Sequence, residues 1–113
     1  MEIFKPIIAG VACCALPSCV TSLESIRARP PFTDTITAAS VDDVKTCLIE
    51  KQQAGLTPVV FEHDGITELM FRSEAAGIGF DYQLTAVKGG TRVVLRRKNA
   101  IAPGIAKAST CYN

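Results

Sequence analysis

The segment from Ile78 to Lys88 restricts the fold more than any other part of the chain. Its side chains alternate between an apolar set and a polar set: Phe80, Tyr82, Leu84 and Ala86 against Asp81, Gln83 and Thr85. Successive side chains of a β-strand point to opposite faces, so this pattern predicts a strand with one buried face and one solvated face. Such a strand needs partner strands and a layer that covers its apolar face.

Four further segments have the composition of strands, namely residues 33–38, 58–62, 66–72 and 91–98. Asp64-Gly65 separates the second from the third, and an Asp-Gly pair between apolar runs is a strong hairpin signal. Gly89-Gly90 similarly predicts a turn before the last strand. Residues 73–77 are interpreted as a connection.

A helix is predicted from Val41 to Gln53. Ser40, with Asp43 three residues later, resembles a capping box, and Gly55 is placed to end the helix. Apolar residues recur at spacings of three and four: Val41, Val44, Cys47 and Leu48. In a chain of 113 residues this predicts one α+β domain. One helix packs on a three- to four-stranded antiparallel sheet, in the order β-α-β-β-β-β.

The first twenty residues differ in composition from the rest of the chain. The apolar run of residues 7–16 is too short to span a membrane but has the length of the hydrophobic part of a secretory signal. A buried N-terminal helix is the alternative interpretation. From Val20 the chain becomes polar and includes Pro30-Pro31, which predicts a flexible linker. The predicted organisation is a signal peptide over residues 1–18, a lipidated cysteine and linker over 19–32, and a domain over 33–113.

The sequence Leu16-Pro17-Ser18-Cys19 resembles the lipobox of bacterial lipoproteins. The resemblance implies cleavage before Cys19, which would then carry lipid on its sulfur and its new amino group. It also implies a domain held on the bacterial cell envelope and facing the periplasm, with the outer membrane as the expected location. Gly10-Val11-Ala12-Cys13 is a second match, with Ala12 better placed and Gly10 a poorer apolar residue. Cys13 therefore stays as the alternative lipidation site.

The five cysteines divide accordingly. Cleavage before Cys19 removes Cys13 and Cys14, and lipidation uses Cys19. Cys47 and Cys111 remain, and an oxidising compartment would favour a disulfide between them. Two buried free thiols of a cytosolic protein are the alternative.

The chain has few residues that indicate catalysis or metal binding. His63 is the only histidine and is interpreted as an exposed turn residue, so there are too few ligands for zinc. An acid–base pair for glycoside cleavage could come from five carboxylates, namely Glu62, Asp64, Glu68, Glu74 and Asp81. Only seven aromatic residues are available, however, to line a sugar-binding groove. The sequence therefore predicts no catalytic residue, no metal and no cofactor.

Four basic residues end the last predicted strand: Arg92, Arg96, Arg97 and Lys98. They are either a solvated sheet edge that resists aggregation or a contact for an acidic protein or anionic lipid headgroups. Nucleic acid is not an expected partner, because the net charge is only +1 and no stacking aromatic accompanies the cluster.

Two functions follow from the anchor, the linker and the missing catalytic set. The first is a non-enzymatic envelope lipoprotein whose periplasmic domain mediates protein–protein interaction, as a candidate subunit of a larger envelope assembly. The alternative is a tethered inhibitor or exclusion factor against a lytic enzyme, a phage or a conjugative system. Residues 73–79 are the candidate inhibitory loop.

Overall fold

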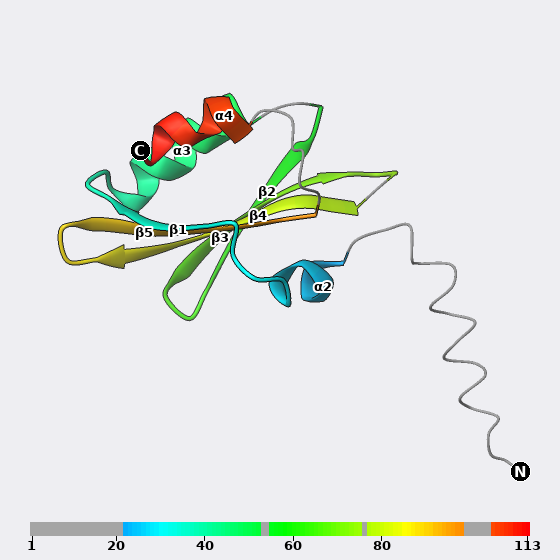
Figure 1. Ribbon diagram of the computed structural model, residues 1–113, viewed down its shortest axis with the longest axis horizontal. Coiled ribbons are helices and arrows are strands. Elements are labelled where there is room, and N and C mark those ends of the chain that lie inside the picture. The colour runs from blue at the N-terminus through cyan, green and yellow to red at the C-terminus, as the bar shows by residue number, and fades with distance from the viewer. Residues whose placement is uncertain (1–21, 53–54, 76, 99–104) are drawn as a thin grey trace, which may run out of the picture.

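A five-stranded antiparallel sheet organises the molecule (Figure 1). The computed structural model describes residues 22–52, 55–75, 77–98 and 105–113. The strands are β1 (Thr33–Thr37), β2 (Thr57–His63), β3 (Ile66–Ser73), β4 (Gly77–Val87) and β5 (Gly90–Arg97). Their spatial order is β1-β5-β4-β3-β2, so β4 lies at the centre and β1 and β2 are the two edges.

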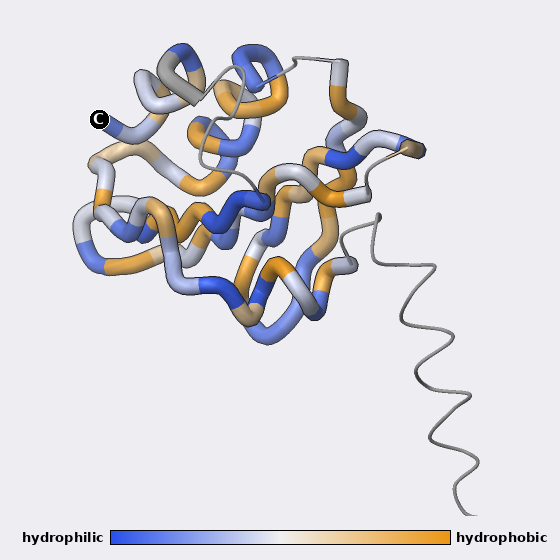
Figure 2. Tube along the Cα trace, turned by 45° about the vertical axis from the view of Figure 1, so that its right-hand side comes forward, coloured by the Kyte–Doolittle hydropathy of each residue, from blue (hydrophilic) through white to orange (hydrophobic). Residues whose placement is uncertain are grey.

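The alternation along β4 separates the two faces of the sheet. Phe80, Tyr82 and Leu84 are buried in the main core, and Leu69 and Phe71 of β3 and Val93 and Leu95 of β5 join them. Figure 2 shows the same change from hydrophobic to hydrophilic residues along the strands. The predicted alternation is therefore confirmed for Phe80, Tyr82 and Leu84. Ala86 is instead exposed, and Asp81, on the face predicted to be solvated, is buried.

Two helical segments cover the apolar face, as Figure 1 shows. Helix α3 (Val41–Lys51) begins after Ser40, whose Oγ accepts a hydrogen bond from the Asp43 N–H at 3.1 Å. Its residues Val44 and Leu48 are fully buried in the core. The short helix α4 (Ile105–Ala108) and the 3-10 turn η2 (Ser109–Cys111) lie beside α3.

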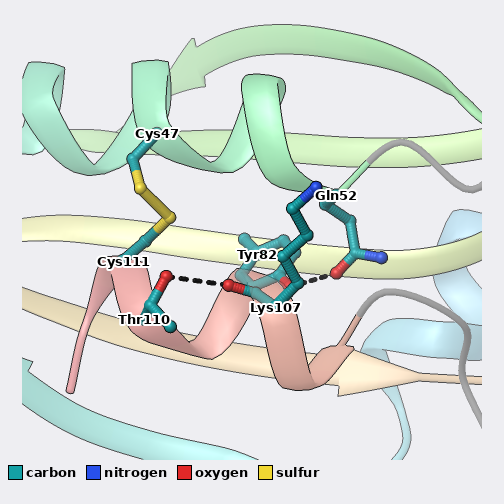
Figure 3. Close-up of a disulfide and its surroundings, with 6 residues drawn as sticks. All are labelled: Cys47, Gln52, Tyr82, Lys107, Thr110 and Cys111. Atoms are coloured by element: carbon teal, nitrogen blue, oxygen red, sulfur yellow. Dashed lines mark hydrogen bonds between the residues drawn. A yellow bond between two sulfur atoms is a disulfide. The ribbon is translucent and has the colours of Figure 1, made fainter.

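The predicted disulfide joins α3 to the C-terminal segment (Figure 3). Cys47 and Cys111 have Cα atoms 5.7 Å apart and close a separation of 64 residues. Behind them the Tyr82 hydroxyl donates to Gln52 Oε1 at 2.8 Å, so the one polar atom that Tyr82 brings into the core is hydrogen-bonded. The disulfide thus closes the helical layer over the sheet.

The number of strands corrects the sequence prediction. The sheet has five strands rather than three to four, because β1 returns to pair with β5 in the register Thr33↔Leu95 to Thr37↔Thr91. Partners separated by more than fifty residues leave no local signal in the sequence. The element order also differs from the predicted one, because helix α2 (Leu23–Arg27) precedes β1 and α4 follows β5.

Helix α2 also corrects the predicted linker. Its Ile26 is 0% exposed, and α2 packs on β4 and β5. In Figure 1 it lies on the side of the sheet opposite α3 and α4. The predicted linker therefore contains a folded segment from Ser22 onward. The predicted signal peptide and residues 19–21 lie outside the described residues.

Candidate functional site on the polar face of the sheet

Helix α2 delivers a basic side chain to the polar face of the sheet. The Ser22 Oγ accepts from the Ser25 N–H at 3.2 Å, and this cap starts a helix of only five residues. A helix this short has little stability of its own, so burial of Ile26 against the sheet must hold it in place. That packing brings the Arg27 guanidinium over β3.

Glu68 of β3 is the centre of a polar cluster. Arg27 donates to both of its carboxylate oxygens, from Nε at 3.0 Å and from its second nitrogen in a close ion pair. His63 Nε2 lies 2.7 Å from Glu68 Oε1. The Glu68 side chain is 0% exposed, whereas Arg27 and His63 are about one third exposed at 36% and 33%. Burial opposes ionisation of Glu68, but its hydrogen bonds with Arg27 and His63 outweigh burial and lower its pKa to about 2.

Asp81 of β4 is the second buried carboxyl group of this cluster. It is 0% exposed, and neither carboxyl oxygen has a hydrogen-bond partner in the described part of the chain. Burial, followed by the neighbouring Glu68 carboxylate, raises its pKa to about 8. At neutral pH the cluster therefore holds one ionised and one protonated carboxyl group, the arrangement in which like charges are avoided.

The geometry favours a structural role for this carboxyl pair. An acid–base pair must touch its substrate, and both groups lie fully buried. Only the rim of the cluster, at Arg27 and His63, reaches solvent. The cluster fastens α2 to the sheet through Arg27 and, as it stands, presents no carboxyl group to an outside molecule.

The structure corrects the interpretation of His63 and extends that of the acids. His63 ends β2, is half-buried, stacks on Phe61 at 5.6 Å between ring centroids and contacts Glu68. Among the five carboxylates, Glu68 and Asp81 come together. The alternation along the strand predicted that Asp81 lies on the polar face, but it did not predict that a helix covers that face. The signal for that burial was Ile26, an apolar residue between Ser22 and Arg27 in the assumed linker.

The basic residues of β5 do not lie on a sheet edge. β5 is between β1 and β4, so the solvated-edge interpretation is wrong. Arg92 makes a two-pronged ion pair with Asp34 of β1, at 2.9 and 2.6 Å. Arg96 donates to the Arg29 carbonyl at 2.9 Å and to Gln83 at 3.0 Å.

The remaining two basic residues, Arg97 and Lys98, lie at the end of β5, where Arg97 contacts an exposed aromatic ring. The guanidinium carbon of Arg97 lies 3.3 Å from the ring centroid of Phe32, which is 47% exposed. The guanidinium of Arg29 donates to the Lys98 carbonyl at 2.6 Å, which holds Arg29 beside Lys98. We call these four residues, Arg29, Phe32, Arg97 and Lys98, the Phe32 patch.

Comparisons with known proteins found no matching family model, no similar curated protein and no similar solved structure. Within the described ranges, no group of histidine, cysteine and acidic residues is arranged to hold a metal ion. No helix among those same residues is both long and apolar enough to cross a bilayer. Both candidate lipidation sites, Cys13 and Cys19, lie outside the described residues.

Proposed function

We propose that this chain is a non-enzymatic cell-envelope lipoprotein, anchored through Cys19 and facing the periplasm of a bacterium. The observation that carries the proposal is the Cys47–Cys111 disulfide, which closes the fold and is typical of an oxidising compartment. The lipobox-like sequence before Cys19 supplies the route to that compartment. Fold and signal are independent features of the chain, and both point to export.

The domain's task in this proposal is to bind another envelope protein by adding a strand to its sheet. Edge strand β2 pairs with β3 on one side only among the described residues. It carries the apolar run Pro58–Phe61, in which Val60 is 40% exposed. A free edge provides backbone hydrogen bonds for an incoming strand, and exposed apolar side chains provide affinity.

Intact-mass spectrometry of the membrane-extracted protein tests the anchor. The expected mass corresponds to residues 19–113 plus acyl chains, less two hydrogens for the disulfide. A mass that begins at Cys13 would move the anchor to the alternative site. An uncleaved chain from Met1 with five free thiols would refute the proposal.

A pair of edge variants tests the binding role. Val60→Glu places a charge on β2, and Ile36→Glu places the same charge on β1, where Ile36 is 62% exposed. We expect a stoichiometric partner that co-purifies with the wild type and with Ile36→Glu, and that is lost with Val60→Glu. Equal recovery with both variants would exclude the β2 edge. Recovery of a lytic enzyme in an inactive complex would instead support the tethered inhibitor.

A further inference from the structure

The distance between the anchor and the fold is much shorter than the sequence predicts. The predicted linker ran over residues 19–32, but the folded structure begins at Ser22, the cap of α2. Only Val20 and Thr21 lie between Cys19 and Ser22, and three fully extended steps of the chain span about 11 Å. With lipid on Cys19, the start of α2 at Ser22 is confined to within about 11 Å of the lipidated residue.

The Phe32 patch follows this anchored end of the chain and is the part of the domain best suited to face lipid. It lies directly after α2 in the chain and combines three cations with a large exposed apolar ring. Arg96 fixes the backbone of this segment by donating to the Arg29 carbonyl, and the Phe32 N–H donates to the Leu95 carbonyl at 2.7 Å. The patch is therefore held on the end of β5.

The charges around the patch favour an anionic partner. Between Cys19 and Phe32 the only acidic residue is Glu24, and Arg27 is already paired with Glu68. The buried acids Glu68 and Asp81 do not reach the surface. Arg29 is exposed, and Arg97 and Lys98 are half-buried. A Lys or Arg near an anionic membrane contributes on the order of 1 kcal/mol, or about fivefold in affinity. An aromatic ring at the interface adds a shallow apolar contact.

We propose that the Phe32 patch docks on anionic lipid headgroups and orients the anchored domain on its membrane. This inference rests on the proposed lipid anchor. Docking would leave edge strand β2, at the opposite edge of the sheet from β1, free to receive the partner strand. The anchor supplies attachment, and the patch supplies orientation.

A single introduced tryptophan tests the docking, because the chain has no Trp of its own. Full-length, membrane-extracted Phe32→Trp keeps an aromatic ring beneath Arg97, and Val60→Trp places the matched probe on the β2 edge. Each protein is reconstituted into phosphatidylcholine vesicles with and without about 30% phosphatidylglycerol, with a quencher at headgroup depth. We expect about threefold stronger quenching of the Phe32→Trp probe in the anionic vesicles, and no change for the Val60→Trp probe.

A charge-reversal pair supplies the control for electrostatics. In the Phe32→Trp background, Arg29→Glu with Lys98→Glu should abolish the added quenching. Lys88→Glu with Lys107→Glu makes the same change of charge on the β4–β5 turn and on α4, and should preserve the added quenching. Because Arg29 also makes backbone contacts, a salt titration of the unreversed protein repeats the test without altering the fold. Added quenching should disappear between about 0.05 and 0.5 M salt while the protein stays on the vesicles.

The outcomes separate the docking from the anchor. A protein that carries acyl chains and floats with both vesicle types, but shows equal quenching in both, would overturn the docking and leave the anchor intact. A protein without acyl chains that floats only with anionic vesicles would support the docking and refute the anchor. A protein without acyl chains that floats with neither would refute both.

Discussion

At the scale of single residues, the polar face of the sheet is dominated by two neighbouring carboxyl groups, an ionised Glu68 and a protonated Asp81. Glu68 is ionised because Arg27 and His63 contact it, whereas Asp81 beside it has no hydrogen-bond partner among the described residues and keeps its proton. Both groups influence stability, but with opposite signs. The pH dependence of the free energy of unfolding therefore tests the protonation states assigned to this pair.

The pKa of Asp81 predicts that stability falls as the pH rises from about 4 to 8. The folded state raises this pKa from 3.8 to about 8, so between those values the folded chain binds the proton more strongly than the unfolded chain does. Stability from the protonated group is complete below pH 3.8 and is lost as the pH approaches 8, by at most about 1.4 kcal/mol per pH unit. Asp81→Asn, which cannot ionise, should remove this slope and be more stable than the wild type at pH 8. Urea unfolding of the wild type and of Asp81→Asn at pH 5 and pH 8 measures this difference in stability.

Glu68→Gln is the matched control, because it also neutralises one carboxyl group of the cluster. Its expected effect is the reverse, a destabilisation of about 2 kcal/mol at neutral pH, since Arg27 loses its ionised partner. Because the pKa of Glu68 is lowered from 4.5 to about 2, its stabilisation is present above pH 4.5 and lost as the pH falls to 2. If both variants changed stability in the same direction, the assigned protonation states would be wrong.

At the scale of elements, α2 and β1 turn a meander into a complete domain. The sheet through β5 is built from neighbours in sequence, whereas β1 joins from the distant start of the chain. Both elements depend on tertiary contacts, α2 through Ile26 and β1 through its ladder with β5. Each contact can be removed singly.

Ile26→Ala should destabilise the domain by about 2 kcal/mol, because it leaves a cavity under α2. Leu23→Ala changes the same helix at a half-buried position and should have a smaller effect. Urea unfolding of the two variants gives the comparison. An unchanged free energy of unfolding for Ile26→Ala would mean that α2 contributes nothing to the cooperative fold.

Gly90 is required where the β4–β5 turn passes the end of β1. Its φ is +152°, and a Cβ there would collide with the carbonyl oxygen of Thr37. Gly90→Ala should destabilise the protein by about 3 kcal/mol, through backbone strain and displacement of β1. Gly89, with φ +88° and no atom near its position for a Cβ, serves as control, and Gly89→Ala should lose only about 1 kcal/mol. Thermal unfolding would show the order, and equal losses would mean that the Thr37 contact is unimportant.

For the whole molecule, the disulfide has the largest single effect on stability that we expect. It closes 64 residues and holds the C-terminal segment on α3. A domain of this size has a modest core, so one covalent closure is a substantial part of its stability.

Cys47→Ala with Cys111→Ala should lower the free energy of unfolding by about 4 kcal/mol, because the unfolded chain regains the conformations that the closed loop excludes. Urea unfolding of the double variant and of the reduced wild type should agree. Thr46→Ala, at an exposed neighbour in α3, should leave the unfolding midpoint nearly unchanged. A double variant as stable as the oxidised wild type would contradict the expected stabilisation.

The elements that the sequence predicted well have local signals. Ser40 and the spacing of Val44 and Leu48 indicated α3, and Asp64-Gly65 indicated the β2–β3 hairpin. Asp64 and Gly65 do have positive φ, as a tight turn of this kind needs. The candidate site was predicted only in part, because the alternation assigned Asp81 to the polar face but could not show that Ile26 and Arg27 would cover it.

The sequence by itself determined the α+β class, the hairpins and α3, because these follow from periodicity and turn chemistry. Only the tertiary structure decided that β1 closes the sheet beside β5, that α2 belongs to the fold and that Glu68 and Asp81 meet beneath it. These features depend on contacts between residues more than forty positions apart, or on burial produced by them. Desolvation by α2 is what separates the two carboxyl pKa values, and desolvation exists only once the chain has folded.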